Sequence, residues 1–399
     1  MRTLFITVAI AAALAGCGKS EPASQTGTDA SFEARLQEQL LDAKPGSVIE
    51  IPAGHYSLRR GLSLRTDGVT IKGAGMDKTV LSFKGQVVGP EGLLVNASDF
   101  TIENLALEDT KGDALKINQG KNITIRGVRI EWTDGPKTTN GAYGLYPVKT
   151  QNVLIENSVV IGASDAGIYV GQSHDIIVRN NRAEYNVAGV EIENSVNADV
   201  YENEVYDNTA GILALVLPNL RIKKNQYVLL RDNDIHDNNR QGFAETGTVV
   251  SYVPKGIGIL SLCGRDIEIR DNTITNNNAI AVMVVSYKTF ETLTGRTLED
   301  TALDAFLHNV YVHGNTFTNN GTAPTLPLTA FGTSFADVVW DGVLEDGETV
   351  DDAKICIGTD GDTTFQNIDI AGTNPSTDTT GHLCALTELP EMNDFSGIE

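Results

Sequence analysis

Short stretches with alternating apolar and polar residues recur along this chain. In each stretch a polar residue precedes two aliphatic residues at positions i and i+2, then comes Asn or Gly, and then another apolar residue. Clear examples are KNITIRGVRI at 121–130, HDIIVRNNRA at 174–183 and RDIEIRDNTI at 265–274. A period of two residues is typical of strands with one buried face. The pattern therefore predicts a chain built mainly from short strands.

The spacing of these stretches sets the length of the repeat. Their first apolar positions are residues 69, 100, 123, 153, 176, 198, 228, 267 and 310. The shortest intervals, 22 and 23 residues, suit three short strands and three turns, which is one coil of a parallel β-helix. Leucine-rich repeats are disfavoured because the chain has no recurrent Leu lattice and no helical segment in each repeat. We predict an all-β parallel β-helix solenoid of about 10 coils over residues 45–320.

Two segments are expected to cover the ends of this solenoid, because exposed strand edges recruit other chains. Residues 31–44 predict an N-terminal capping helix. Its apolar residues at helical spacing are Phe32, Leu36, Leu40 and Leu41. Residues 321–399 are acidic and less regular, and we expect them to form one or two further coils and a C-terminal cap.

Asn recurs at matched turn positions of the interior coils. The aligned residues are Asn186, Asn208, Asn238 and Asn277. Stacked Asn side chains can hydrogen-bond amide to amide along the solenoid, each bond contributing about 0.5–1.5 kcal/mol net. This alignment predicts a structural ladder.

Several of these segments resemble known protein families. GSVIEIPAGHY at 46–56 and GVTIKGAG at 68–75 resemble the first coils of the pectin-lyase-like superfamily of right-handed β-helices. GIYVGQS at 167–173 and NVAGVEIENS at 186–195 resemble an exported β-helix-repeat lipoprotein family of unassigned activity. The resemblance covers roughly residues 45–320 and implies a right-handed solenoid, export and an exported partner protein. It carries over no catalytic residue.

The N-terminus has the features of a bacterial export signal. Arg2 precedes an apolar run at 4–15 that is too short for a permanent transmembrane helix. Leu-Ala-Gly-Cys at 14–17 resembles the lipobox of bacterial lipoproteins. Residues 1–16 are therefore expected to be a lipoprotein signal peptide, and Cys17 the lipidated residue.

The residues after Cys17 suggest how the protein is attached. Residues 17–30 are rich in Ser, Thr, Gln, Pro and Gly and predict a flexible tether. Gly18 stands where an Asp would resemble an inner-membrane retention signal. We expect a cell-envelope protein held to the membrane by its lipid, with the outer membrane favoured in a cell that has one.

Charge and cysteine content narrow the function classes. The formal net charge of −22 disfavours nucleic acid as a partner, because phosphate contacts need clustered Lys and Arg. It leaves room for a polyanionic substrate, since a basic groove can exist on an acidic surface. Three cysteines follow the tether, so three pairings are open. We favour a Cys356–Cys384 disulfide, with Cys263 buried and reduced.

A second set of strands gives an outward-facing row. Four short apolar segments precede successive repeated stretches at matching distances. They are LKI at 115–117, LYP at 145–147, IYV at 168–170 and VEI at 190–192. The middle residues should face outward, one above another: Lys116, Tyr146, Tyr169 and Glu191. Adjacent rungs of a β-helix are about 4.8 Å apart, so this row suits an extended polymer. Four more polar residues lie just beyond it: Lys149, Gln172, Glu193 and Asn194.

The long intervals between repeats place insertions next to this same row. The insertions are residues 134–142, 213–225, 240–255 and 286–307. Functional residues often lie on loops held by a rigid scaffold. We therefore expect these insertions to wall a polysaccharide-binding groove.

Two kinds of catalysis fit such a groove. A lyase or epimerase acting on uronic acids needs a base and a cation or metal, and Tyr146 or Tyr169 with Lys116 or Lys149 could supply them. A glycoside hydrolase needs two carboxylates, about 6.5–9.5 Å apart when it inverts. Glu191 and Glu193 approach that spacing.

These patterns leave the reaction open. The catalytic candidates are Glu191, Glu193, Tyr169 and Lys116, and the ligand-binding candidates are Tyr146, Lys149, Gln172 and Asn194. The alternative is a non-catalytic carbohydrate-binding or scaffold lipoprotein that works with an exported partner. A third hypothesis is an accessory protein that delivers a ligand or metal. Acidic pairs could bind Ca²⁺ through oxygen ligands, but no cofactor is assigned with certainty.

Overall fold

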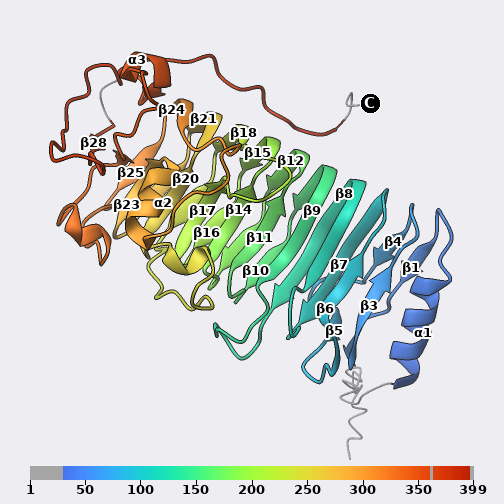
Figure 1. The fold of residues 1–399 in the computed structure, drawn as a ribbon. Coiled ribbons are helices and arrows are strands. Elements are labelled where there is room, and N and C mark those ends of the chain that lie inside the picture. The colour runs from blue at the N-terminus through green and yellow to red at the C-terminus, as the bar shows by residue number, and fades with distance from the viewer. Residues whose placement is uncertain (1–29, 360–362, 396–399) are drawn as a thin grey trace, which may run out of the picture.

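The computed structural model describes residues 30–359 and 363–395, and the predicted signal peptide, Cys17 and nearly all of the tether lie outside the described residues. Within the described residues 28 strands form one continuous parallel ladder, with α1 (Ala30–Leu41) at its N-terminal end. Figure 1 shows this ladder as a long stack of strands. The all-β solenoid predicted from the repeats is confirmed.

Three parallel sheets make up the walls of the solenoid. Sheet A consists of β3 (Arg60–Leu64), β6 (Val88–Val95), β11 (Ala166–Gly171), β14 (Ala188–Glu193), β17 (Ala210–Leu215), β20 (Ile257–Leu262), β23 (Ile280–Val285), β26 (Val338–Trp340) and β28 (Phe365–Asn367). Sheet B consists of β1 (Val48–Glu50), β4 (Thr70–Lys72), β12 (His174–Arg179), β15 (Val196–Tyr201), β18 (Gln226–Arg231), β21 (Gly264–Arg270), β24 (Leu307–His313) and β27 (Ile355–Cys356). Sheet C consists of β2 (Gly54–Ser57), β5 (Thr79–Ser82), β10 (Val159–Ile161), β13 (Arg182–Glu184), β16 (Glu204–Tyr206), β19 (Asp234–His236), β22 (Thr273–Thr275) and β25 (Thr316–Thr318).

Three longer strands pass from one sheet into the next. They are β7 (Phe100–Glu108), which joins sheets B and C, β8 (Leu115–Glu131), which contributes to all three, and β9 (Tyr143–Glu156), which joins sheets A and B. The aliphatic residues of every coil point into one shared core. Ile176, Val178 and Ile192 have no exposed surface there, which confirms the inward register read from the alternation.

The predicted Asn ladder is confirmed and is one of two. Each side-chain amide donates to the Asn of the next coil, from Asn186 to Asn208, Asn238, Asn277 and Asn320, over 3.0–3.2 Å. The second ladder occupies another corner of the coil and contains Asn181, Asn203, Asn233, Asn272 and Asn315. Both ladders satisfy buried backbone groups at the turns, where an unpaired group would be costly.

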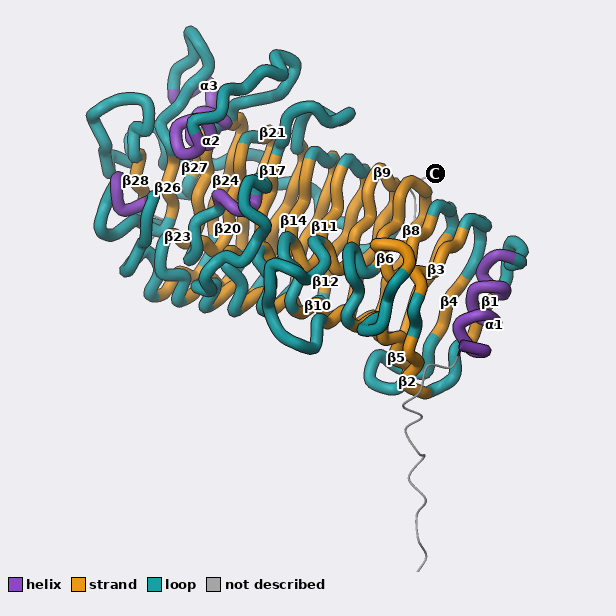
Figure 2. Tube along the Cα trace, turned by 60° about the horizontal axis from the view of Figure 1, so that its bottom comes forward, coloured by secondary structure: helices purple, strands orange, loops and turns teal. Residues whose placement is uncertain are grey.

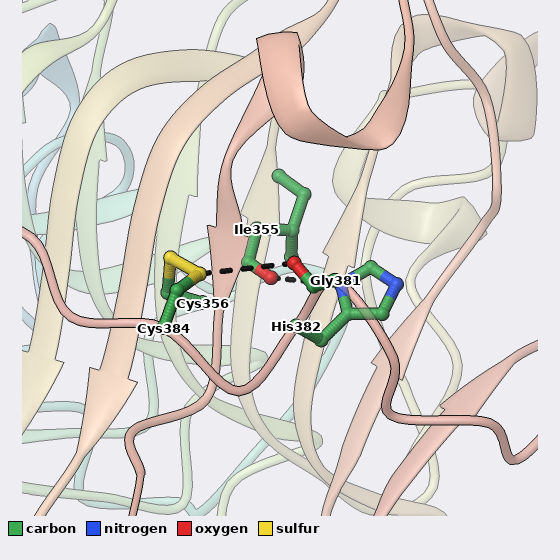
Figure 3. Close-up of a disulfide and its surroundings, with 5 residues drawn as sticks. All are labelled: Ile355, Cys356, Gly381, His382 and Cys384. Atoms are coloured by element: carbon green, nitrogen blue, oxygen red, sulfur yellow. Dashed lines mark hydrogen bonds between the residues drawn. A yellow bond between two sulfur atoms is a disulfide. The ribbon is translucent and has the colours of Figure 1, made fainter.

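The two ends of the solenoid are covered. Leu36 and Leu40 of α1 are buried against the first coils, whereas Leu41 is 62% exposed and does not belong to the apolar face assigned to it. At the other end Cys384 forms a disulfide with Cys356 of β27, with Cα atoms 5.0 Å apart (Figure 3). Cys263 is buried and carries a free thiol.

Within residues 30–359 and 363–395, two short helices and two 3₁₀ turns lie in the connections. They are α2 (Tyr287–Thr294), α3 (Val350–Ala353), η1 (Val250–Tyr252) and η2 (Leu328–Ala330). Among the residues that the structure describes, no helix has both the length and the apolar character needed to cross a membrane.

Candidate functional site

The predicted outward row exists on sheet A. Lys116 of β8 pairs with Tyr146 of β9, and Tyr169 of β11 pairs with Glu191 of β14. The rings of Tyr146 and Tyr169 meet edge to face, with centroids 4.9 Å apart. We call Lys116, Tyr146, Tyr169 and Glu191 the site row. Beyond Glu191 the same row continues with apolar residues, first Leu213 of β17.

The exposure predicted for the site row is wrong at its C-terminal end. Tyr169 is 4% exposed and Glu191 is 3% exposed, whereas Lys116 and Tyr146 are half-buried. Tyr169 belongs to a second apolar cluster, outside the solenoid core, that includes Leu213 and is packed by Phe243 of an insertion. An insertion therefore does not only border the outer face of sheet A but also packs on part of that face.

All of the large insertions border sheet A. Residues 132–142 and 237–256 precede its strands, and residues 216–225 and 286–306 follow them. Leu213, assigned to an insertion, lies within β17. Another insertion, 319–337 before β26, had no repeat signal on its C-terminal side and was not predicted. Figure 2 shows these connections as teal loops that project from the ladder of strands.

Glu191 and Glu193 form a buried carboxyl pair. Their side chains hydrogen-bond to each other, and the Tyr169 hydroxyl donates to Glu193 Oε1 over 2.7 Å. The other oxygen of Glu191, Oε2, has no hydrogen-bond partner in the described part of the chain. Burial raises the pKa of both carboxyl groups.

Gly171 makes this arrangement possible. It lies two residues after Tyr169 on β11, and the phenol ring lies directly over it. A Cβ atom at Gly171 would lie 2.1 Å from the Tyr169 hydroxyl oxygen. The glycine thus allows the ring to fold down toward Glu193, which explains why Tyr169 is buried and does not stand out into solvent as a sugar-stacking platform.

Asp165 and Tyr143 complete the cluster and were not predicted. Asp165 lies in the turn immediately before β11, and its partly exposed carboxyl group accepts a hydrogen bond from Tyr143. Burial, with the nearby Glu193 carboxylate, raises the pKa of Asp165 to about 7. A carboxyl group that titrates near neutrality is suited to general acid–base catalysis. We call Asp165, Glu191, Glu193, Tyr143, Tyr146 and Tyr169 the acid–tyrosine cluster.

Lys116 is engaged at the edge of this cluster. Its Nζ lies 3.0 Å from Asp113 Oδ2 and 4.7 Å from the centre of the Tyr146 ring. Burial raises the pKa of the Asp113 carboxyl group despite this lysine. Burial also raises the pKa of Tyr143, Tyr146 and Tyr169. These phenols therefore stay protonated at neutral pH and can donate hydrogen bonds, but they are poor bases.

A cationic cavity of about 620 Å³ opens beside the C-terminal ends of the site strands. Its lining residues are Gln119, Lys149, Gln172, Asn219, Leu220 and Arg221. Lys149 and Arg221 are exposed, and neither has an ion pair with an acidic residue among the described residues. Two unpaired cations with amide groups between them suit a carboxylate ligand.

Asn194, which was also predicted to bind a ligand, does not line this cavity. It has no exposed surface, and its amide donates to the carbonyl groups of Leu217 and Ile222 over 2.9 and 2.6 Å. Its Oδ1 accepts from the Leu217 N–H. Asn194 therefore anchors the 216–225 insertion that carries Arg221.

A separate group of residues could hold a metal ion. His308, Glu345 and Glu348 offer ligand atoms within 4.8 Å of one another, and His308 Nε2 lies 2.9 Å from both Glu348 oxygens. The imidazole does not point specifically to Ca²⁺, which prefers oxygen ligands. His308 lies in β24 of sheet B, and Glu345 and Glu348 lie in the connection between β26 and β27, so this group is not part of the acid–tyrosine cluster.

Comparison with known proteins identifies the architecture. A family model described as "Right handed beta helix region" matches residues 67–226. No curated protein matches the chain at a significant level.

Three solved structures illustrate the likeness. The A-module of mannuronan C-5 epimerase AlgE6 from Azotobacter vinelandii aligns at 21% identity over 79% of this chain and 87% of that chain, with a TM-score of 0.51. The catalytic unit of a GH87 alpha-1,3-glucanase from Streptomyces thermodiastaticus aligns at 16% identity over 87% and 52%, with a TM-score of 0.50. An exopolygalacturonase from Thermotoga maritima aligns at 12% identity over 72% and 84%, with a TM-score of 0.46. The family model and the first two of these structures thus identify a right-handed parallel β-helix fold.

Proposed function

We propose that this protein acts on an anionic polysaccharide that lies along sheet A, and that the acid–tyrosine cluster transfers the proton. The observation that carries this proposal is the concentration of three carboxyl groups and three tyrosines on the one face that the insertions border. The named activities of two structural neighbours, mannuronan C-5 epimerase and alpha-1,3-glucanase, lend support because both substrates are polysaccharides.

Each part of the site has a role in this proposal. Asp165 is the proton-transfer group, because its carboxyl group is partly exposed and its pKa of about 7 lets it both give and take a proton. Lys149 and Arg221, beside the opposite end of β11 from Asp165, bind the carboxylates of other units of the same uronic acid polymer, which favours an anionic polysaccharide over a neutral one. Glu191, Glu193 and Tyr169 are positioning residues, since they are buried and hydrogen-bonded among themselves.

The test is incubation of the purified protein with a panel of uronic-acid and neutral polysaccharides. Products that absorb in the ultraviolet indicate a lyase, a changed uronic acid ratio by NMR indicates an epimerase, and new reducing ends alone indicate a hydrolase. Asp165→Asn should lower turnover by at least about 100-fold while binding persists. Asp77→Asn, at an exposed aspartate far along the chain from the cluster, is the matched control and should leave turnover unchanged.

A non-catalytic role in carbohydrate binding is the second candidate. The burial of Tyr169 and Glu191 favours it, because two of the groups expected to react have almost no contact with solvent. Retention of a polysaccharide with no product from any member of the panel would support this role. Lys149→Ala should then weaken retention, whereas Asp165→Asn should have little effect.

The export signal is part of the same proposal. The lipobox-like sequence ending at Cys17 supports a lipid-anchored protein of the cell envelope, and the resemblance to an exported lipoprotein family supports an exported partner. A polysaccharide of the cell surface or its surroundings would be reachable from that location.

A further inference from the structure

The outer face of sheet B carries two parallel rows of side chains between β12 and β21. The first row is Arg179, Tyr201, Arg231 and Arg270, and the second is Ile177, Asp199, Leu229 and Glu268. Cations and carboxylates therefore lie side by side along the solenoid axis. This face is distinct from sheet A, where the acid–tyrosine cluster lies.

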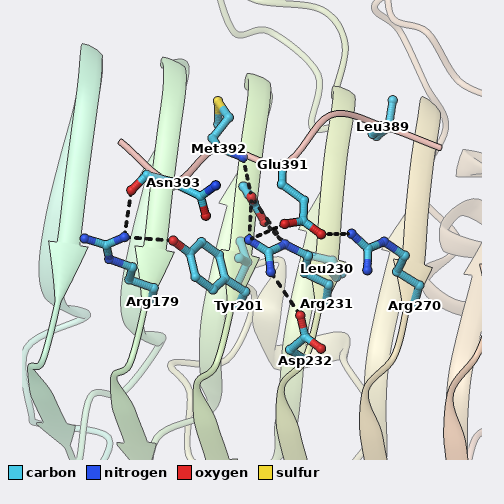
Figure 4. A network of polar contacts seen from close by, with 12 residues as sticks. Arg179, Tyr201, Leu230, Arg231, Asp232, Arg270, Leu389, Glu391, Met392 and Asn393 are labelled. Atoms are coloured by element: carbon cyan, nitrogen blue, oxygen red, sulfur yellow. Dashed lines mark hydrogen bonds and ion pairs between the residues drawn. The ribbon is translucent and has the colours of Figure 1, made fainter. Parts of the chain in front are cut away.

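The C-terminal segment crosses this face in an extended conformation (Figures 1 and 4). Its backbone makes three of the contacts. The N–H of Leu389 donates to Glu268 Oε2 over 2.5 Å, and the N–H of Met392 donates to Asp199 Oδ2 over 2.8 Å. The carbonyl group of Asn393 accepts from Arg179 Nη1 over 2.7 Å.

The side chain of Glu391 makes the fourth contact. One carboxylate oxygen accepts from Arg270 Nη2 over 2.5 Å, and the other lies 3.9 Å from Arg231 Nη2. The Arg270 hydrogen bond holds the pKa of Glu391 below its usual range. Sheet B thus recognises a backbone N–H, a carboxylate, a second N–H and a carbonyl group at positions i, i+2, i+3 and i+4 of an extended peptide.

The segment is a thin layer on the surface. Glu388, Pro390 and Glu391 are exposed, and Leu389 and Met392 are only half-buried. A cavity of about 260 Å³ remains where residues 386–389 pass over Glu268 and Tyr311. The tail is held mainly by polar contacts to Asp199, Glu268 and the arginines of the first row, and the two carboxylates, at most 2% exposed, must be solvated when the tail lifts. If the tail left sheet B, the Cys356–Cys384 disulfide would still attach the start of the tail to β27.

We propose that this face of sheet B is a docking track for an extended acidic peptide of a partner protein, and that residues 386–394 occupy it as an internal competitor. A peptide suits the track better than an acidic glycan, because Asp199 and Glu268 accept backbone N–H groups and would repel a second polyanion. Ile177 and Leu229 alternate with Asp199 and Glu268 in the second row and are at most 1% exposed, which gives the track a small apolar floor.

Fluorescence anisotropy with a labelled peptide, LTELPEMND (residues 386–394), tests this proposal on the full chain. Glu391→Lys should loosen the internal tail and raise the affinity for the labelled peptide at least tenfold over the unchanged protein. Adding Arg231→Glu to that variant should abolish the gain. Glu388→Lys makes the same charge change on an exposed tail residue with no ion pair in the described part of the chain, and it should leave peptide binding at the level of the unchanged protein.

Hydrogen exchange on the unchanged protein tests the same proposal without a variant. The amides of Leu389 and Met392 should exchange at least about 100-fold faster than those of β15, because a tail that leaves the track opens locally. Equal protection of the tail and β15, or no peptide binding to Glu391→Lys, would show that the segment is a permanent part of the fold and overturn the proposal.

Discussion

At the scale of single residues, the acid–tyrosine cluster couples the stability of the protein to pH. Burial raises the pKa of Asp165, Glu191 and Glu193, so the folded chain keeps protons that the unfolded chain has released at the same pH. Stability changes with pH in proportion to the protons bound by the unfolded chain minus those bound by the folded chain. The contribution of these three carboxyl groups to stability should therefore be fully present below about pH 4, where the same groups of the unfolded chain are protonated. This contribution should fall as the pH rises toward the pKa values of the folded chain, which is about 7 for Asp165.

Glu191→Gln should remove part of this dependence. The amide keeps the shape of the carboxyl group and can still donate to Glu193, but it does not titrate. We expect a gain of about 1–2 kcal/mol in the free energy of unfolding at pH 8, and a smaller decline between pH 5 and pH 8. Urea unfolding at several pH values measures both. Glu50→Gln, at an exposed position of β1, should change neither, and an unaltered pH slope in Glu191→Gln would mean that Glu191 holds no proton in the folded chain.

The same residues show what local sequence can and cannot predict. Alternation along each strand predicted the register of Tyr169 and Glu191, because side-chain direction follows from the strand itself. The burial of Tyr169 involves Gly171 beneath its ring and an apolar cluster packed by Phe243, 74 residues further along, which no local pattern encodes. Asp165 lies one residue before its strand, so a search restricted to strand positions could not find it.

At the scale of structural elements, the two Asn ladders tie successive coils together. Asn208 has no exposed surface and takes part in bonds above and below it. Its amide donates to Asn238, and its Oδ1 accepts from both the backbone and the side chain of Asn186. Such a residue cannot be removed without leaving buried polar groups unpaired.

Asn208→Ala should therefore destabilise the protein strongly. Each buried donor or acceptor left without a partner costs about 1–3 kcal/mol, so we expect a loss of more than about 2 kcal/mol, measured as a lower urea midpoint at unchanged slope. Asn374→Ala, at an exposed position outside the solenoid, should cost less than about 0.5 kcal/mol. Similar losses for the two variants would mean that water replaces the ladder bonds at little cost.

The insertions were predictable in position but not in structure. The long repeat intervals located most of them beside sheet A, because an insertion must interrupt the 22–23-residue spacing. The helix α2 within the 286–306 insertion depends on a distant residue. Asp341, with no exposed surface, accepts hydrogen bonds from Ser286 and Thr289 over 2.7–2.8 Å. That contact spans more than 50 residues and leaves no trace in the local sequence.

At the scale of the whole molecule, repetition made the fold predictable. Each coil contacts mainly its neighbours, so the pattern of one coil predicts all of them. The C-terminal tail shows the opposite case, since Glu391 meets Arg270 across 121 residues of sequence. Sheet A and sheet B are different walls of the solenoid, so a polysaccharide on one and a peptide on the other could be bound at the same time.

The last prediction concerns where the whole molecule resides. If Cys17 is lipidated, the folded body is attached to a membrane through the residues between Cys17 and α1, because a lipid anchor inserts without a transmembrane helix. Cys17→Ser should move the protein from the membrane fraction to the soluble fraction and abolish labelling by a radioactive fatty acid. Cys263→Ser, which changes the buried free thiol, should keep both the label and the membrane association. If Cys17→Ser stayed in the membrane fraction, the lipid anchor would be rejected, and contacts other than a lipid on Cys17 would have to hold the protein at the membrane.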